Sequence, residues 1–159
     1  MILISHRGNI NGRQPNLENL PEYIDSALEL GYDVEIDIWA DKENNLSLGH
    51  DYAQYPVEIN WLLDRKEHLW IHCKNFEALN KIMGLDLKSF YHEKENYTIV
   101  SIANFSRALT DNLIWAHNLD NVSNKCIIPL LSKKDITQWK PTEVYGICSD
   151  YVELLKNKK

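Results

Sequence analysis

The sequence predicts a single α/β domain built on a largely parallel sheet. Apolar strand-like runs alternate with helix-like segments through the first half of the chain, a rhythm typical of parallel strands joined by helices. The 159 residues are 44% hydrophobic and 25% charged, which suits one globular domain. No repeat, low-complexity tract or linker divides the sequence, so residues 1–159 are expected to form one unit.

The first half shows the clearest periodicity. The run from Met1 to Ser5 is a predicted strand, and a polar loop follows it as far as Asn16. Apolar residues at helical spacing predict a helix from Leu20 to Leu30, ending at Gly31. The remaining elements expected in this half are strands at Tyr32 to Trp39, Leu46 to Gly49 and Leu69 to Lys74, and a helix from Phe76 to Met83.

The second half reads differently, because its apolar runs are separated by segments with few amphipathic helix patterns. Strands are therefore expected to outnumber helices there. The predicted strands are Ser89 to Tyr91, Thr98 to Ile102, Leu113 to Ala116, Cys126 to Leu131 and Val144 to Cys148.

Composition narrows the classes of partner and location. With 17 basic and 23 acidic residues the net charge is −6, so the chain carries no electrostatic footprint for nucleic acid. No segment reaches the roughly 18 apolar residues of a membrane span, and no basic start leads into an apolar stretch. A cytoplasmic protein is expected. The three cysteines lack metal-type spacing and suit reduced, buried thiols; they are Cys73, Cys126 and Cys148.

The first chemical signal lies where the opening strand should end, at His6-Arg7-Gly8. A histidine can move protons, an arginine can hold an anion, and a glycine lets backbone approach a ligand closely. The three residues together are a plausible phosphate-chemistry cluster.

The second predicted strand adds two carboxylates. Glu35 and Asp37 alternate with Val34, Ile36 and Ile38, so both acidic side chains share one face of the strand. Carboxylates at this spacing commonly ligate a hard cation. The alternative is an edge strand with a solvated acidic face.

A second histidine follows the next strand-like segment, in His50-Asp51. Two imidazoles on either side of a substrate could divide the proton transfers between them. Reactive groups at several strand ends are typical of the mouth of a β/α barrel. The alternative is an ordinary surface His-Asp dipeptide.

In this order, His6-Arg7-Gly8, Glu18-Asn19, Glu35-Ile36-Asp37 and His50-Asp51 resemble the glycerophosphodiester phosphodiesterase family. Its members carry an HRG strand end, a Pro-Glu-Asn loop, a Glu-x-Asp strand and a His-Asp segment on a TIM-type barrel. The resemblance covers residues 2–51 strongly and returns at Tyr145 to Tyr151, which is similar to the family's final strand and turn.

Carried over by position, the resemblance implies that His6 and His50 are the acid/base pair. It also implies that Glu35 and Asp37 bind one divalent cation. We take His6 as the base and His50 as the acid, an orientation that the sequence does not fix.

Three further positions are implied to contact or position the substrate phosphate. Arg7 is the expected phosphate contact. Glu18 and Asn19 match the loop after the first strand, with Asn16-Leu17 in place of the family's proline, and their expected role is to position other groups or the substrate.

The next strand departs from the family. Where members have Glu-x-Lys, this chain has His72-Cys73-Lys74, which keeps the phosphate-binding lysine. His72 and Lys74 share a face, so His72 is the candidate third ligand. A nitrogen ligand favours Mn²⁺ or Zn²⁺ over Ca²⁺ or Mg²⁺ without excluding Mg²⁺ completed by water. Alternatively, His72 only hydrogen-bonds the phosphate.

Length is the second departure, because a complete (β/α)₈ barrel typically needs about 250 residues. We therefore expect a reduced TIM-type barrel in which several outer helices are missing or replaced by loops. Four tryptophans could cover the exposed wall, line a homo-oligomer interface or simply fill the core. They are Trp61, Trp70, Trp115 and Trp139.

The sequence thus predicts metal-dependent hydrolysis of a small glycerophosphodiester-like molecule or headgroup. Two alternatives stay open: a noncatalytic module that binds phosphate or a sugar phosphate, and a lyase that forms a cyclic phosphate. His68, His92 and His117 have no assigned role. His117 could reach the barrel mouth, although a structural role is favoured for it.

Overall fold

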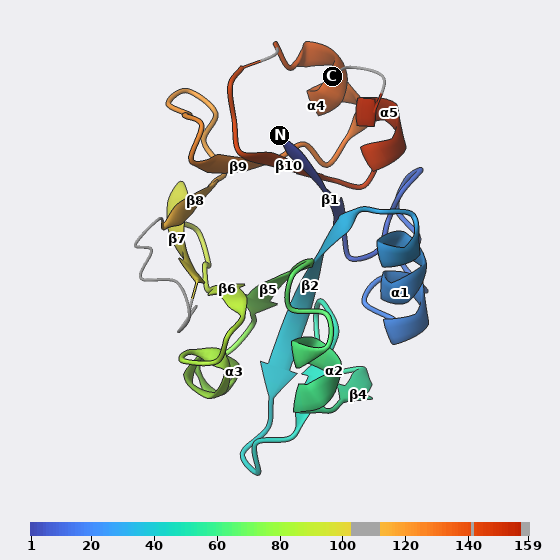
Figure 1. Ribbon diagram of the computed structural model, residues 1–159, viewed down its shortest axis with the longest axis vertical. Coiled ribbons are helices and arrows are strands. Elements are labelled where there is room, and N and C mark those ends of the chain that lie inside the picture. The colour runs from blue at the N-terminus through green and yellow to red at the C-terminus, as the bar shows by residue number, and fades with distance from the viewer. Residues whose placement is uncertain (103–111, 141, 157–159) are drawn as a thin grey trace.

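The chain folds into a small closed barrel, described by a computed structural model over residues 1–102, 112–140 and 142–156. Eight strands form its wall, in chain order around the ring (Figure 1). β1 pairs with both β2 and β10, and this closes the sheet. The wall strands are β1 (Ile2–His6), β2 (Asp33–Ala40), β5 (Leu69–Cys73), β6 (Lys88–Phe90), β7 (Tyr97–Ile102), β8 (Leu113–Ala116), β9 (Cys126–Pro129) and β10 (Gly146–Ser149).

The prediction of a largely parallel sheet is confirmed, with one exception in the second half. β7 runs antiparallel to both β6 and β8, whereas the other neighbouring wall strands are parallel. A parallel crossover needs a dozen or more residues, usually including a helix, but an antiparallel pair needs only a short loop. Residues 91–96 make such a link between β6 and β7. Reversing one strand therefore shortens the barrel.

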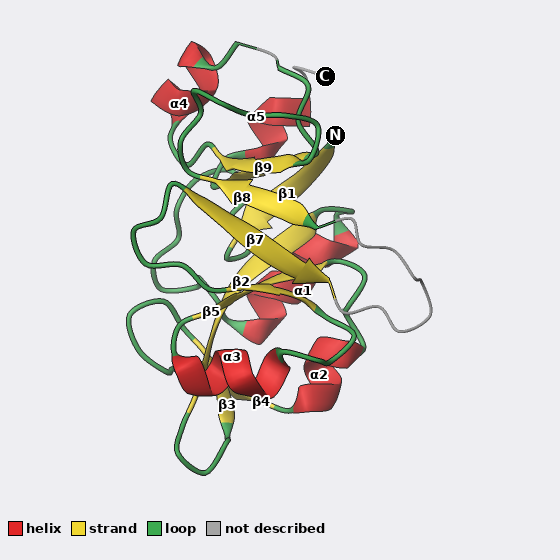
Figure 2. Cartoon of the chain, turned by 90° about the vertical axis from the view of Figure 1, so that its left-hand side faces the viewer, coloured by secondary structure: helices red, strands yellow, loops and turns green. Residues whose placement is uncertain are grey.

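The helices lie outside the ring and cover only part of it. α1 (Pro21–Glu29), α2 (Ile59–Leu63) and α3 (Phe76–Ile82) flank the strands of the first half. α4 (Lys133–Gln138) and α5 (Val152–Lys156) lie beside β9, β10 and β1. Figure 2 shows β7 on the side facing the viewer, with no helix in front of it. The fold is thus a reduced TIM-type barrel.

Several short elements have no counterpart in the sequence prediction. A hairpin of β3 (Leu46–Leu48) and β4 (Tyr55–Val57) extends β2 beyond the ring. β3 is predicted, but β4, α2, α4 and α5 are not. These helices are only five or six residues long, too short for an apolar period to stand out. Ser132 nevertheless starts α4 with a capping box to Asp135.

Among the described residues, three apolar clusters hold the barrel together: one packs under α1, α2 and α3, one under α4 and α5, and one fills the ring. The outward-facing residues Val34, Ile36 and Ile38 of β2 are fully buried in the cluster that includes residues of α1, α2 and α3. The third cluster fills the barrel, with Ile4, Trp70, Phe90, Val100, Leu113, Trp115, Ile127 and Cys148.

The tryptophans mostly take the core role. Trp70 and Trp115 are buried inside the barrel, while Trp61 and Trp139 are half-buried against its outside. All three cysteines are buried free thiols, as expected. Within the described residues, no helix combines the length and apolarity needed to cross a membrane.

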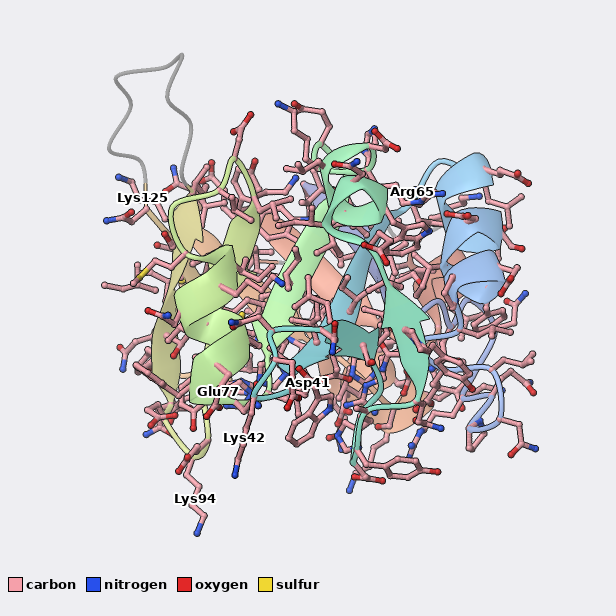
Figure 3. The ribbon with its side chains drawn as sticks, turned by 90° about the horizontal axis from the view of Figure 1, so that it is seen from below. Asp41, Lys42, Arg65, Glu77, Lys94 and Lys125 are labelled. Atoms are coloured by element: carbon pink, nitrogen blue, oxygen red, sulfur yellow. The ribbon has the colours of Figure 1, made fainter. Side chains whose placement is uncertain are left out.

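The direction of the strands gives the barrel two distinct ends. Seen from below in Figure 3, Asp41, Lys42 and Lys94 extend from one end, and Arg65 and Lys125 lie at the other. The first three follow the carboxyl ends of β2 and β6, whereas Arg65 and Lys125 precede β5 and β9. The predicted site residues on the strands are level with one another around the ring, because Glu35 of β2 lies opposite His6, the last residue of β1, and Asp37 lies opposite His72 of β5. The topology therefore delivers them to one end.

Candidate functional site

A cavity of about 470 Å³ opens at the carboxyl-terminal end of the barrel strands. One side of it is lined by six of the nine residues that the sequence singles out. They are His6, Arg7, Glu35, His50, His72 and Lys74. The structure thus brings together groups from β1, β2 and β5 and from the segments that follow β3 and β5.

The carboxylates of β2 face the barrel interior. β2 is bordered by β1 on one side and β5 on the other, so it is not an edge strand. Glu35 is 3% exposed and Asp37 is fully buried. This rules out the alternative of a solvated acidic face and leaves two buried acids that need compensating partners.

Glu35, Asp37 and His72 form a group that could hold a metal ion, with one candidate ligand atom from each lying within 4.8 Å of the others. His72 Nδ1 lies 3.0 Å from Asp37 Oδ1 and 3.8 Å from Glu35 Oε1. Glu35 Oε2 is buried and has no hydrogen-bond partner among the described residues. An orphaned carboxylate oxygen beside a second acid and an imidazole fits a divalent cation.

Asp37 is held in place from several directions. Asn19 accepts a hydrogen bond from the backbone N–H of Asp37 at 2.9 Å, and its amide donates to Asp37 Oδ2 at 3.0 Å. Arg7 Nε contacts Oδ2 at 2.7 Å and Lys74 Nζ lies 3.4 Å from Oδ1. Burial acts to raise the pKa of Asp37, but the hydrogen bond from His72 and the charge of Arg7 lower it well below its usual range. Asp37 is therefore an anion.

Glu35 has the opposite electrostatic environment. Its burial, together with the neighbouring Asp37 carboxylate, raises the pKa of Glu35 well above its usual value despite the charges of Arg7 and Lys74. A cation shared by the two acids would reverse this, because it would favour the charged form of both.

His6 is oriented by a residue at the other end of the chain. Its Nδ1 lies 2.7 Å from Oδ1 of Asp150, which follows β10 and is itself 1% exposed. Asn9 Nδ2 donates to the same oxygen at 2.8 Å. His6 Nε2 is left 3.8 Å from Glu35 Oε2, at the cavity. The sequence analysis does not identify Asp150, although it lies in the recognised segment from Tyr145 to Tyr151.

His50 also carries an aspartate partner, in a more open setting. Its Nδ1 lies 2.7 Å from Asp51 Oδ1, and its side chain is 41% exposed. Burial and the charge of Arg7 lower its pKa, so the ring is predominantly neutral at pH 7. Gly49 makes the turn at φ +149°, where an added Cβ would lie 2.1 Å from the Tyr52 carbonyl oxygen.

Glu18 lies behind Arg7 rather than in the cavity wall. It accepts hydrogen bonds from Arg7 Nη1 at 3.2 Å and from Arg13 Nε at 3.1 Å. Arg7 and Asn19 both have positive φ, at +56° and +64°, a strained backbone region for these residues. Glu18 and Asn19 thus contact the groups that line the cavity, which is the positioning role expected for them.

The rest of the cavity wall is largely aromatic and packs against His72, and its sequence gives little sign of this role. Phe90, His92, Trp115 and His117 all line the cavity. The His92 and His117 rings lie 4.2 Å apart, and the Phe90 and Trp115 rings lie 4.5 Å apart. Burial lowers the pKa of His92 to about 4 and also lowers that of His117. This wall therefore adds no positive charge at pH 7. His68 instead pairs with Asp33, away from the cavity.

Comparison with known proteins gives a distant structural likeness. No family model matches the sequence, and no curated protein matches it. Among solved structures, the chain is similar to a glycerophosphodiester phosphodiesterase from Thermotoga maritima, with a TM-score of 0.48 and 14% identity over 100% of this chain and 98% of that one. A candidate glycerophosphodiester phosphodiesterase from Galdieria sulphuraria gives a TM-score of 0.46 and 14% identity, over 99% and 96%.

The closed strand pairing of the chain, rather than this likeness, defines its fold as a reduced TIM-type barrel.

Proposed function

We propose that the protein hydrolyses a small phosphodiester, such as a glycerophosphodiester, with a divalent cation and a pair of histidines. One observation carries the proposal. A single cavity contains a buried Glu35, Asp37 and His72 group, two cationic side chains, and two histidines that each pair with an aspartate. A site that only binds phosphate has no need of two oriented imidazoles.

Glu35, Asp37 and His72 would hold the cation. Bound there, it would supply Lewis-acid stabilisation of the negative charge that develops on the phosphoryl oxygens. Arg7 and Lys74 line the same side of the cavity and would share that charge. Their contacts with Asp37 fix both cationic groups before the substrate arrives.

His6 is the better placed base. Its Nδ1–H donates to Asp150, so Nε2 carries the lone pair and faces the cavity. It would take the proton from a water molecule or from an adjacent substrate hydroxyl. His50, on the segment after β3, would protonate the leaving alkoxide from its imidazolium form, which is the minority form at pH 7 because its pKa is lowered. Both rings place Nδ1 on an aspartate, so the assignment rests on burial: Asp150 is 1% exposed, whereas the side chain of Asp51 is 81% exposed.

Phosphorus NMR of glycerophosphodiesters incubated with the protein tests the proposal. We expect a phosphomonoester in the presence of a divalent cation and none after chelation. A cyclic phosphate product would show that a substrate hydroxyl attacks in place of water and would replace hydrolysis by the lyase reaction. No turnover across a panel of diesters with different alcohols, with each of Mg²⁺, Ca²⁺, Mn²⁺ and Zn²⁺ supplied, would contradict catalysis and favour a phosphate-binding module.

A further inference from the structure

We infer that His72 presents its Nδ1 to the cation and makes this a mixed nitrogen and oxygen site that takes Zn²⁺ or Mn²⁺ in preference to Mg²⁺ or Ca²⁺. The inference rests on the proposed function for the location of the cation, but not on turnover. It concerns the identity of the cation, because the sequence does not decide among Mg²⁺, Ca²⁺, Mn²⁺ and Zn²⁺.

The two nitrogens of His72 have different surroundings. Nδ1 faces the carboxylates, at 3.0 Å from Asp37 Oδ1 and 3.8 Å from Glu35 Oε1. Nε2 points the other way and lies 3.5 Å from the backbone carbonyl oxygen of His92. A metal-binding histidine commonly donates its second ring N–H to a carbonyl or carboxylate, and this fixes the tautomer. In the absence of a cation, the Nδ1–H of His72 donates to the Asp37 carboxylate. A bound cation would take the place of that proton, and the His92 carbonyl is placed to accept the N–H of the other tautomer, which leaves Nδ1 as the ligand.

The orientation of the His72 ring is restricted by its aromatic neighbours. The Phe90 ring lies nearly parallel to it at 5.1 Å and 1°, and the His92 ring at 4.7 Å and 12°. The His72 side chain is only 9% exposed. The stacked rings fix the plane of the His72 ring, and tilting it out of that plane would carry Nδ1 away from the carboxylates, so Phe90 acts as a positioning residue for the nitrogen ligand.

The charges around the site also bear on the choice of cation. Glu35 and Asp37 bring two negative charges when both are ionised, but Arg7 and Lys74 lie within ion-pair distance of Asp37. These two cations offset part of the charge of the two acids, and Arg7 is shared with Glu18 at 3.2 Å. Mg²⁺ and Ca²⁺ bind oxygen ligands chiefly through charge, and here they would gain less from it. Imidazole suits Zn²⁺, and carboxylates also suit Mn²⁺, so the nitrogen bond decides the order.

Metal binding to the whole chain, stripped of metal by chelation, tests this without an activity assay. Co²⁺ is titrated into the protein while its visible absorption is followed. Zn²⁺, Mn²⁺, Mg²⁺ and Ca²⁺ are then added in separate competition experiments. We expect one Co²⁺ per chain, displaced most readily by Zn²⁺, then by Mn²⁺, with Mg²⁺ and Ca²⁺ needing at least about 100-fold more than Zn²⁺. Failure of Co²⁺ to bind, or competition by Mg²⁺ as effective as that by Zn²⁺, would overturn the inference.

His72→Glu makes the ligand set all oxygen and should remove the preference, so that Mg²⁺ or Ca²⁺ competes nearly as well as Zn²⁺. His117→Glu is the matched control, because it places the same new acid in the same cavity at a residue outside the candidate ligand group, and it should leave the preference for Zn²⁺ unchanged. An unchanged preference in His72→Glu, or the same loss of preference in both variants, would contradict the inference.

Phe90→Leu keeps every proposed ligand, so it tests the inference if circular dichroism shows that His72→Glu does not fold. Freeing the ring should weaken Zn²⁺ binding by about 10- to 100-fold and Mg²⁺ binding much less. Equal weakening of both ions would show only a structural role for Phe90 and overturn its positioning of His72. The phosphorus NMR assay is independent of these titrations. Absence of turnover with the preference for Zn²⁺ intact would contradict only the proposed function, and turnover without that preference would contradict only the inference about His72.

Discussion

The two halves of the barrel are built differently and contribute different chemistry. In the first half, the wall strands β1, β2, β5 and β6 are parallel, α1, α2 and α3 flank them, and nearly all the charged groups of the cavity originate there. In the second half, from β7 to β10, one strand is reversed, and the described residues that line the cavity are Trp115, His117, Pro129, Leu131 and Cys148, none of them an acid or a lysine or arginine.

This difference indicates which half of the barrel tolerates shortening. The β2 carboxylates must be buried at fixed spacing, so β2 needs neighbours on both sides and a packed outer face. β7 only completes the wall, and its outer residue Ile99 is 65% exposed. At the site itself, Asp150 links the two halves, because it lies just after β10 and contacts His6 of β1.

The largest effect should come from removing Asp37. Asp37→Ala removes the buried carboxylate that Arg7 and Lys74 share, so we expect it to lower the free energy of unfolding by about 3–5 kcal/mol and to abolish cation binding. Urea denaturation and metal analysis measure the two effects. Glu29→Ala, which removes an exposed acid at the end of α1, should change stability by less than about 0.5 kcal/mol. Similar losses in both variants would contradict the described network.

A matched pair of isoleucines compares the packing of the two halves directly. Ile36 of β2 is fully buried, so Ile36→Ala should lower the free energy of unfolding by about 2–5 kcal/mol. Ile99→Ala removes the same atoms from the exposed face of β7 and should cost about 0.5 kcal/mol or less. Denaturant midpoints give both values. A large loss of stability in Ile99→Ala would mean that another surface covers the outer face of β7 in solution.

The aspartate partners of the two histidines should differ in importance. Asp150→Asn disturbs a buried orienting contact and should lower kcat about 100-fold, because small misplacements of a catalytic group are costly. The side chain of Asp51 is 81% exposed, so Asp51→Asn should lower kcat by much less. Steady-state rates on one diester decide the point. Equal losses would remove the distinction between the two histidines.

The smallest predicted effect is on the pH dependence of stability. Burial of Glu18 acts to raise its pKa, but hydrogen bonds from Arg13 and Asn9 outweigh it and hold the pKa at about 2, against an ordinary value of 4.5. The stabilisation from this lowered pKa is fully present above pH 4.5 and is lost as pH falls towards 2. Glu18→Gln should therefore show a shallower fall in melting temperature over that range. An unchanged slope would contradict the assignment.

Much of the site could be predicted because its signals are local. The alternation around Glu35 and Asp37 fixes which face they share, and the histidines follow apolar runs that end at the barrel mouth. Asp150 could not be assigned in this way, since its partner lies 144 residues away. The reversal of β7 was also hidden, because an apolar run has the same appearance in either strand direction.

The central claim is that the first half of the chain carries the chemistry and the second half shapes the cavity. The kcat of His6→Ala and His117→Ala, measured on one diester that the wild type turns over, tests it most directly. We expect His6→Ala to lose about 100-fold or more. We expect His117→Ala to change KM with kcat nearly unchanged. An equal loss of kcat in both variants, or near-normal kcat in His6→Ala, would contradict the account.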